Sequence, residues 1–365
     1  MDNFRGIILN TSYPKIGRTS DIEILGKSML DWVKIALSGS FIAAVDYDGE
    51  TPVPLAVRPF LDLSAQYTVV LYSDTPLISK RSVVDAVAAL EENGQNVLKM
   101  TRGYVFRTAF LMSVDKIYTE QTFYLEEEDF ITAFNYKQIQ LITDVLKSRI
   151  IAFHMENGVY FEDSQSAFIG SDVKIGKNVR IAPGNTVLGN TVIGDGVTLK
   201  CGNVIENCVI DDGATVDSSR LYSSFIGKRT KVGPFAYIRP DSVIGDDCRI
   251  GDFVEIKKSI IGNGSKISHL TYVGDCEMGS GCNVGCGVVF CNYDGKNKHK
   301  TLVGNNVFIG SNCNLIAPIK VGDGAFIAAG STLTDGVPPD ALAVARARQT
   351  VKPEWQGNKF RKQDK

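Results

Sequence analysis

Histidine is a useful starting point for a search for acid-base chemistry, because this chain of 365 residues contains three. His269 lies in SHLTYVGD (268–275), among polar residues, at a point where the surrounding sequence repeats apolar ones. A lone histidine is more often structural than catalytic, but polar residues recur around this one at intervals of 17 to 20 positions, as in Glu255, Tyr272 and Asn292. A base near a carboxylate, with lysines close by, is typical of an acid-base site for an anionic substrate.

The other two histidines give weaker signals. His154 lies in a segment with helical spacing, and we assign it no role. His299 lies in CNYDGKNKHKT (291–301), where we expect it to be solvated. This polar, basic stretch also carries Tyr293 and Lys298, and it interrupts an otherwise regular repeat. We therefore expect it to form a loop that leaves the repeating scaffold.

The repeat itself indicates the fold of the second half of the chain. From about residue 165, apolar residues recur every six positions and are often followed by glycine. The longest runs are Ile169, Ile175, Ile181, Val187, Ile193, Leu199 and Ile205; Ile226, Val232, Ile238, Ile244, Ile250 and Ile256; and Val303, Ile309, Leu315, Val321, Ile327 and Leu333. A period of six fits neither an α-helix nor a hairpin and is typical of a β-helix, in which three hexads make one triangular coil. We expect roughly nine coils, spaced about 4.8 Å apart.

The first half has a different pattern. Strand-like segments at 4–9, 41–48 and 67–74 alternate with segments of helical spacing, and the last of these strands is apolar enough to be buried on both faces. The expected helices are 22–37, 79–94 and 135–158. Alternation of strands and helices predicts a parallel, Rossmann-like sheet. The predicted organisation is an α/β domain with a linker helix (1–160), an all-β parallel β-helix (161–340) and a C-terminal tail (341–365).

Composition excludes several classes of protein. The net charge of −2 argues against a general nucleic-acid binder. No apolar run is long enough for a membrane span, and the N-terminus does not resemble a signal peptide, so we expect a cytoplasmic protein. All eight cysteines lie between Cys201 and Cys313 without a CxxC pair, which makes a zinc ribbon or redox motif improbable and predicts reduced packing residues.

Several segments of the second half resemble one family closely. They are GPFAYIRP (233–240), VEIKKS (254–259), SHLTYVGD (268–275), NVGCG (283–287), CNYDGKNKHKT (291–301), FIGSNCNLIAP (308–318), IAAGSTLT (327–334) and ALAVARARQ (341–349). In this order they are similar to the acetyltransferase half of the bifunctional N-acetylglucosamine-1-phosphate uridyltransferase/glucosamine-1-phosphate acetyltransferase family. The resemblance implies a left-handed β-helix, acetyl-CoA as co-substrate and a homotrimer in which the loop at 291–301 serves a neighbouring subunit.

The resemblance also implies roles for individual residues. His269 would take a proton from the sugar amine, and Glu255 would lie near it as the second catalytic residue. Arg239 and Lys257 would hold the sugar phosphate. The remaining implied residues are Tyr272, Asn283 and Lys298 for the amino sugar, and Cys286, Asn292, Tyr293, Ser311, Ala329 and Arg346 for acetyl-CoA. Two positions depart from the family, with Tyr237 in place of an arginine and Cys286 in place of an alanine.

The first half resembles the uridyltransferase half only in fragments, such as LGKSMLDW (25–32) and VVLYSDTPLIS (69–79). Strand one is followed by NTSYPKIGRTSD (10–21), whereas the family has a glycine-rich turn whose backbone N–H groups cradle phosphates. Asp74 and Asn135 would stand where the family binds Mg²⁺. Two ligands without a phosphate loop indicate a remnant, so we expect uridyl transfer to be lost.

These patterns predict an acetyl-CoA-dependent N-acetyltransferase that acts on an amino sugar phosphate, with glucosamine 1-phosphate as the leading acceptor. Three alternatives stay open. The acceptor could be another amino sugar or a sugar nucleotide. The enzyme could still be bifunctional and release pyrophosphate from UTP. The chain could also be a trimeric sugar- or nucleotide-binding scaffold without activity, although a scaffold has no need for the polar surroundings of His269.

Overall fold

The structure is a computed structural model that describes residues 3–118, 122–123 and 127–353. The chain divides into two compact units, one of Met1–Ile193 with Ile205–Asn207 and one of Gly194–Val204 with Cys208–Lys365. This division passes through the β-helix and not through residue 160. The secondary structure nevertheless changes from a long helix to short strands between Glu156 and Val159, and a domain boundary there stays a prediction.

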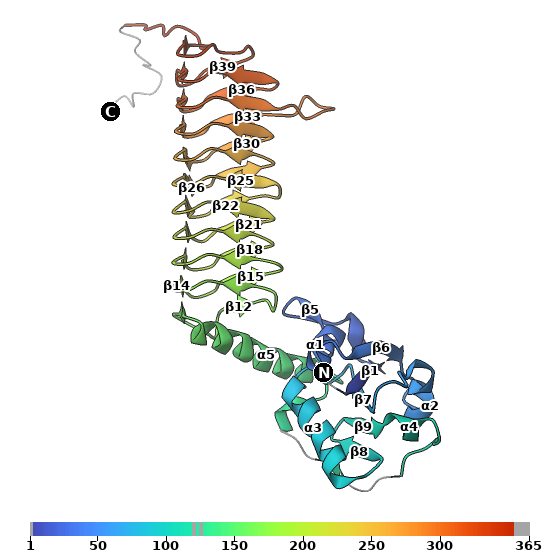
Figure 1. The fold of residues 1–365 in the computed structure, drawn as a ribbon. Coiled ribbons are helices and arrows are strands. Elements are labelled where there is room, and N and C mark those ends of the chain that lie inside the picture. Colours follow the sequence, from blue (N-terminus) through green and yellow to red (C-terminus); the bar gives the residue numbers. More distant parts are fainter. Residues whose placement is uncertain (1–2, 119–121, 124–126, 354–365) are drawn as a thin grey trace, which may run out of the picture. The chain divides into compact units, whose positions relative to one another are not determined.

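Six strands form the sheet of the N-terminal part, in the order β10-β8-β9-β7-β1-β6 (Figure 1). They are β1 (Phe4–Asn10), β6 (Phe41–Asp46), β7 (Tyr67–Tyr72), β8 (Val97–Met100), β9 (Gly103–Arg107) and β10 (Thr122–Phe123). β1 runs parallel to β6 and β7, but β9 is antiparallel to β7 and β8. The three strands expected from the sequence, β1, β6 and β7, are therefore parallel as predicted, and the antiparallel β9 was not among them. The two residues between β8 and β9 allow only a hairpin, because a parallel crossover needs a dozen or more.

The predicted burial of the third strand on both faces is confirmed, since all six residues of β7 are buried. Val69 and Leu71 pack into one apolar cluster, and Val70 and Tyr72 pack into another. Successive side chains of a strand point to opposite faces, so the two clusters lie on opposite sides of the sheet.

The helices are α1 (Met29–Leu37), α2 (Val53–Val57), α3 (Lys80–Asn93), α4 (Thr108–Leu111) and α5 (Tyr136–Glu156), with 3₁₀ turns η1 (Thr19–Asp21), η2 (Arg58–Phe60) and η3 (Glu127–Phe130). The three helices expected from the sequence form, one of them with a later start, and two short helices, α2 and α4, were not predicted. The helix expected from residue 22 begins only at Met29. Leu25 and Gly26 have positive φ and turn the chain, so that β4 (Glu23–Ile24) pairs with β5 (Lys27–Ser28). Another pair, β2 (Ser12–Tyr13) and β3 (Gly17–Arg18), follows β1.

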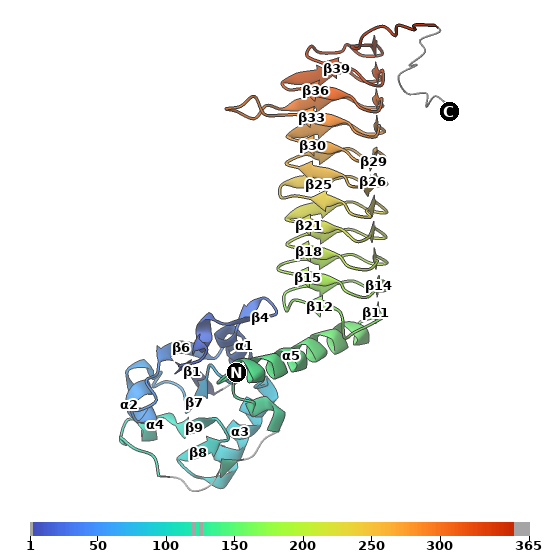
Figure 2. The same ribbon diagram turned by 180° about the vertical axis from the view of Figure 1, so that it is seen from behind.

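Three parallel sheets make up the sides of the β-helix (Figures 1 and 2). The eleven-stranded sheet contains β11 (Val159–Phe161), β14 (Val179–Ile181), β17 (Thr198–Leu199), β20 (Thr215–Val216), β23 (Lys231–Val232), β26 (Arg249–Asp252), β29 (Lys266–His269), β32 (Asn283–Val284), β35 (Phe308–Ile309), β38 (Phe326–Ile327) and β40 (Leu342–Ala343). The ten-stranded sheet contains β12 (Phe168–Ile169), β15 (Thr186–Leu188), β18 (Val204–Glu206), β21 (Arg220–Tyr222), β24 (Tyr237–Ile238), β27 (Glu255–Lys257), β30 (Tyr272–Gly274), β33 (Val289–Cys291), β36 (Asn314–Ile316) and β39 (Thr332–Leu333). The nine-stranded sheet contains β13 (Lys174–Ile175), β16 (Val192–Ile193), β19 (Val209–Ile210), β22 (Ser224–Ile226), β25 (Ser242–Ile244), β28 (Ile260–Ile261), β31 (Cys276–Met278), β34 (Thr301–Val303) and β37 (Ile319–Val321).

The hexad positions form the core of this left-handed β-helix. All the apolar residues of the three predicted runs are buried except Ile175, which is half-buried. The sheets give about ten coils and not nine, because strands form before Ile169 and after Leu333, outside the counted hexads. Each inward side chain stacks on its equivalents in the adjacent coils, so burial repeats with the period of the sequence.

The burial of the cysteines and the polarity of the helices can be compared with the sequence analysis. The eight cysteines are free thiols, and five of them are buried as expected, but Cys201 is exposed and Cys286 and Cys291 are half-buried. Within the part of the chain that the structure describes, no helix is long and apolar enough to cross a membrane.

Candidate active site

The candidate site follows the edge where the eleven-stranded sheet turns into the ten-stranded sheet. β26 ends at Asp252 and β29 ends at His269, and these two residues are partners in the parallel register. Past the corner that follows these strands, Glu255 of β27 pairs with Tyr272 of β30. The polar residues whose spacing suggested neighbouring coils therefore lie on neighbouring strands.

His269 has a carboxylate partner, but this partner is not the residue expected from the family. Nδ1 of His269 lies 2.6 Å from Oδ1 of Asp252, and this hydrogen bond lowers the pKa of the Asp252 carboxyl group. Glu255 instead forms an ion pair with Arg239, with 2.8 Å between Oε1 and Nη1, which raises the pKa of Arg239. The 17-residue interval between Asp252 and His269 was visible in the sequence, so Asp252 could have been identified from the coil period.

Two lysines lie side by side in the site. The pKa of Lys257 is lowered, chiefly by its contact with Lys298 and secondly by partial burial. Two like charges in contact destabilise each other, and an anion placed between them removes that cost. This pair therefore suits the phosphate role that the resemblance gives to Lys257. Arg239, in contrast, already has Glu255 as its partner.

The loop at 292–300 projects from the β-helix between β33 and β34, as Figure 1 shows near β33. It forms a small hairpin with a bridge between Tyr293 and Lys298, and Tyr293 is 60% exposed. Asn292 is buried and donates hydrogen bonds to Tyr272 and Asp275 of its own chain. Asn292 thus anchors the base of the loop to the neighbouring coil of its own chain.

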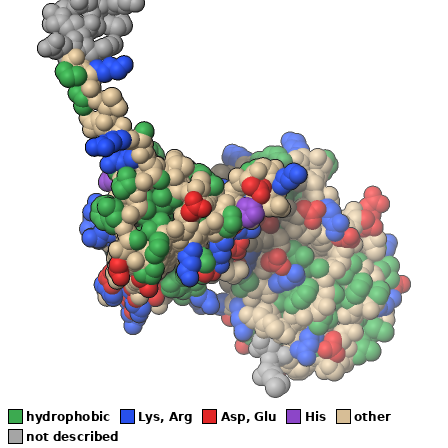
Figure 3. Space-filling model, turned by 90° about the horizontal axis from the view of Figure 1, so that it is seen from above, with side chains coloured by type: hydrophobic (Ala, Val, Ile, Leu, Met, Phe, Trp, Pro, Cys, Tyr) green, Lys and Arg blue, Asp and Glu red, His purple; other side chains and the backbone are tan. Residues whose placement is uncertain are grey.

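His299 is not simply solvated. Its Nε2 atom lies 2.7 Å from Oδ2 of Asp294, and backbone N–H groups together with His299 hold the pKa of Asp294 well below its usual range. Figure 3 shows acidic, basic and histidine side chains exposed on the face of the molecule that is seen from above. The remaining histidine, His154, is buried in α5, and burial lowers its pKa.

Four of the six residues implied for acetyl-CoA, all except Asn292 and Tyr293 of the loop, continue the same edge toward the C-terminus. Cys286, Ser311 and Ala329 each lie two positions beyond the inward residue of successive strands β32, β35 and β38, as His269 does on β29. Arg346 follows β40, and its Cδ atom lies 3.7 Å from the place where a Cβ atom would stand on Gly330. The edge thus presents one row of side chains that begins at Asp252.

Asn283 lies apart from this edge. It is on the outer face of the eleven-stranded sheet, in register with Lys266 and Phe308, whereas Lys257 and Tyr272 lie on the ten-stranded sheet. The structure of one chain therefore does not bring Asn283 to the other residues implied for the amino sugar.

Tyr237, the departure from the family pattern, lies one strand away from Glu255 in the same register. Its ring is edge-on to Tyr222 at 6.1 Å and lies 5.7 Å from the guanidinium carbon of Arg239. A hollow of about 710 Å³ is lined there by residues that include Arg220 and Phe235. The surface beside Arg239 is thus aromatic.

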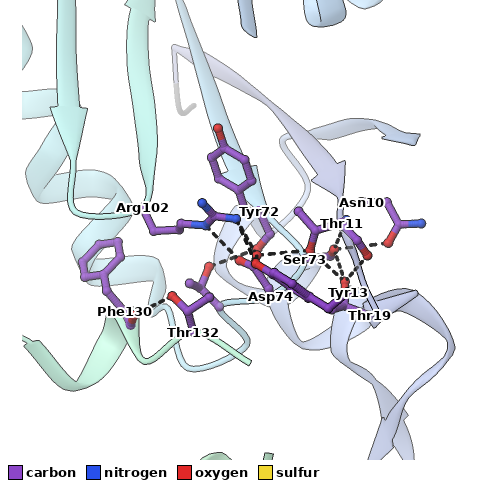
Figure 4. Close-up of polar contacts among 11 residues, drawn as sticks. Asn10, Thr11, Tyr13, Thr19, Tyr72, Ser73, Asp74, Arg102, Phe130 and Thr132 are labelled. Carbon is purple, nitrogen blue, oxygen red and sulfur yellow. Dashed lines mark hydrogen bonds and ion pairs between the residues drawn. The ribbon is translucent and has the colours of Figure 1, made fainter. Parts of the chain in front are cut away.

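In the N-terminal sheet, the residues that follow the carboxyl ends of β1 and β7 form hydrogen bonds with one another and with Arg102 (Figure 4). Asp74 is fully buried, and Arg102 donates to both of its carboxylate oxygens, at 2.6 and 3.2 Å. Thr11 and Tyr13 donate to the same carboxylate, and burial together with this bond raises the pKa of Tyr13 to about 12. Arg102 also lies over the ring of Tyr72, with 4.0 Å between the guanidinium carbon and the ring centroid.

These contacts do not fit the Mg²⁺ site implied by the resemblance. The charge of Asp74 is already neutralised by Arg102, and Asn135 uses its side-chain oxygen to cap α5 by accepting from Lys137 and Gln138. Among the described residues, no three His, Cys, Asp or Glu side chains are grouped so that they could hold a metal ion. Sequence reasoning missed Arg102 and Tyr13, which reach Asp74 from distant points in the chain.

The coils and the polar edge define a hexapeptide-repeat β-helix protein. Residues 172–207 and 300–335 match the family model described as bacterial transferase hexapeptide, and residues 220–294 match the one described as GMPPB C-terminal domain. Over 211 residues the chain is 54% identical to the bifunctional protein GlmU of Clostridium kluyveri. The matched segment covers 58% of this chain and 46% of that protein. Over 218 residues it is 54% identical to GlmU of Clostridium acetobutylicum, with 60% and 48% covered.

The resemblance noted in the sequence is thus confirmed, since the curated relatives are bifunctional GlmU proteins. The chain spans about half the length of these relatives. Among solved structures, LpxA of Bacteroides fragilis, described as a UDP-N-acetylglucosamine acyltransferase, is 24% identical over 49% of this chain and 69% of that chain. Its TM-score of 0.32 is too low to support an inference about function.

Proposed function

We propose that this protein is an acetyl-CoA-dependent N-acetyltransferase that converts glucosamine 1-phosphate to N-acetylglucosamine 1-phosphate. The observation that carries the proposal is the edge at which His269, held by Asp252, begins a row of residues implied for the acyl donor and adjoins a pair of lysines suited to a phosphate. The GlmU relatives support the same class of reaction.

In the proposed reaction the neutral sugar amine attacks the thioester carbonyl carbon of acetyl-CoA. The new N–C bond forms, the C–S bond breaks, and His269 takes the proton that the amine nitrogen loses. The proton then passes to the departing coenzyme A, which leaves as a thiol. Backbone N–H groups would stabilise the negative charge on the carbonyl oxygen in the tetrahedral intermediate. Cys286, Ser311, Ala329 and Arg346 would hold the donor.

A thiol-release assay with acetyl-CoA and a panel of amino sugars tests the proposal. Glucosamine 1-phosphate should give the highest kcat/KM of the panel. A second candidate acceptor, an amino sugar that carries a nucleotide, is favoured by the hollow beside Tyr237 and Arg220. A higher kcat/KM for such a sugar nucleotide would replace glucosamine 1-phosphate with this acceptor. Release of no thiol with any amino sugar would contradict both proposals.

Lys257→Ala should raise the KM for the sugar phosphate by roughly 10- to 100-fold with a smaller change in kcat. A hydrogen bond to a charged group contributes about 1.5–3 kcal/mol, and this change removes one. Steady-state kinetics with varied sugar phosphate measures the effect. Lys231→Ala, which removes an exposed cation from the eleven-stranded sheet, is the matched control and should leave KM unchanged. A KM for Lys257→Ala within twofold of the original value would exclude Lys257 from the phosphate site.

We also propose that the active form is a homotrimer in which each site is shared between chains. Two features support this assembly: the exposed tip of the loop around Tyr293, and the distance of Asn283 from the other acceptor residues of its own chain. A neighbouring copy could supply either element to the edge that carries His269. The mass in solution at micromolar concentration should be that of three chains, and a monomer that is fully active would contradict the shared site.

We further propose that the N-terminal part has lost uridyl transfer. Arg102 and Tyr13 occupy the carboxylate of Asp74, and the segment after β1 folds into β2, β3 and η1 without a glycine-rich turn. This part then serves the fold of the chain and not a second reaction.

A further inference from the structure

We infer that Asp252 is a positioning residue that fixes the tautomer of His269, with the proton on Nδ1 and with Nε2 free to act as the base. The inference rests on the proposed function only for its kinetic consequence. The tautomer itself follows from the contacts of the two side chains. No role was expected for Asp252 from the resemblance, which pointed to Glu255 instead.

The first supporting observation is the hydrogen bond. Ionised Asp252 can only accept, so Nδ1 of His269, 2.6 Å from Oδ1, must carry the proton. Within the described residues, Nε2 has no protein hydrogen-bond partner, and the His269 side chain is 54% exposed. The neutral imidazole therefore presents an unprotonated nitrogen toward solvent, where an acceptor amine can approach.

The second observation is that the two strands that carry Asp252 and His269 are longer than the other strands of the β-helix. β26 and β29 have four residues each, whereas the other described strands of the β-helix have two or three. This extension brings Asp252 into register with His269. It depends on Gly251, because a Cβ atom there would lie 2.0 Å from the backbone oxygen of Ser268. The close approach of the two strands is thus built into the coil.

The third observation is the contrast with the other aspartate-histidine pair. On the loop, Asp294 contacts Nε2 of His299 and not Nδ1. The same reasoning assigns the opposite tautomer to His299. Because the chain has three histidines in all, His269 and His299 provide internal references for each other in one spectrum.

The test is ¹⁵N NMR of the full-length protein labelled only at histidine, with signals assigned by His154→Gln and His299→Gln variants. At a pH where the imidazoles are neutral, His269 should show a protonated Nδ1 and an unprotonated Nε2, and His299 should show the reverse. In Asp252→Ala, the His269 signals should move to a mixture of tautomers. A protonated Nε2 on His269, or a His269 spectrum unchanged in Asp252→Ala, would overturn the inference whether or not the protein is an acetyltransferase.

The kinetic readout separates positioning from folding. Asp252→Ala should lower kcat by roughly 10- to 100-fold, the range that applies when a metal-binding histidine loses the partner that orients it, with the KM for acetyl-CoA within about threefold. Asp252→Glu should restore most of kcat, because the longer carboxylate still reaches Nδ1. Asp247→Asn is the control, because Asp247 lies in the same coil as Asp252 and forms an exposed ion pair with Arg229 of the preceding coil. An Asp252→Ala enzyme with unchanged kcat, measured beside a strongly impaired His269→Ala enzyme, would overturn the inference and leave the proposed function standing.

Discussion

Replacement of His269 by alanine should lower the rate of acetyl transfer by roughly 10²–10⁴-fold, the usual contribution of a positioned general base. The reacting amine must lose a proton as it attacks, and no other described histidine lies on the edge of the β-helix that carries the site. The measurement is kcat with saturating acetyl-CoA and sugar phosphate.

The fold should survive this change. His269 is more than half exposed, so its removal leaves no cavity in the core. The mass in solution and the melting temperature of His269→Ala should therefore match those of the original protein. A kcat within about threefold of the original value would remove His269 from the mechanism.

The second prediction with a large effect is that the protein does not catalyse uridyl transfer. We expect no UDP-N-acetylglucosamine from UTP and N-acetylglucosamine 1-phosphate, with or without Mg²⁺. A triphosphate needs an array of backbone N–H donors, and the segment after β1 has no glycine-rich turn to supply it. The carboxylate of Asp74 is bound by Arg102 and Tyr13 and cannot serve a metal at the same time. The release of pyrophosphate measures this reaction, and a rate within about tenfold of the acetyl step would contradict the assignment.

Asp74→Ala provides the control for this interpretation. If Asp74 is a structural partner of Arg102, its removal deprives this guanidinium, whose side chain is 32% exposed, of its carboxylate and should lower the free energy of unfolding by about 1–3 kcal/mol. If Asp74 were instead a metal ligand, Mg²⁺ would raise the melting temperature of the original protein and the variant would lose that increase. We expect the loss of stability and no effect of Mg²⁺.

The fold of the β-helix was largely predictable, because a hexad repeat states the burial of each position directly. Ile238, Ile256 and Val273 are buried because each occupies the inward position of its hexad, and no distant contact alters that outcome. The N-terminal part was less predictable. α1 began late because Leu25 and Gly26 turn the chain, and β9 ran antiparallel because its connection to β8 is short.

The sequence could predict which edge of the β-helix carries the site, but it could not predict which side chains of the site contact each other. The coil period correctly brought Glu255 beside Tyr272. It did not decide whether Glu255 would contact His269 or Arg239, since that depends on how far β26 and β29 extend before they turn. Contacts such as that between Asp74 and Arg102 depend on tertiary structure alone, because nothing in the local sequence of either residue indicates the other.

The central claim is that acetyl transfer occurs from acetyl-CoA to a sugar amine at the edge that carries His269. The most direct measurement is to incubate the protein with [¹³C]acetyl-CoA and glucosamine 1-phosphate and to identify the product by NMR. We expect the label to appear as an N-acetyl group on the sugar, in amounts equal to the thiol released, and we expect His269→Ala to form this product at least roughly a hundredfold more slowly. Thiol release without labelled sugar, or equal product formation by both proteins, would contradict it.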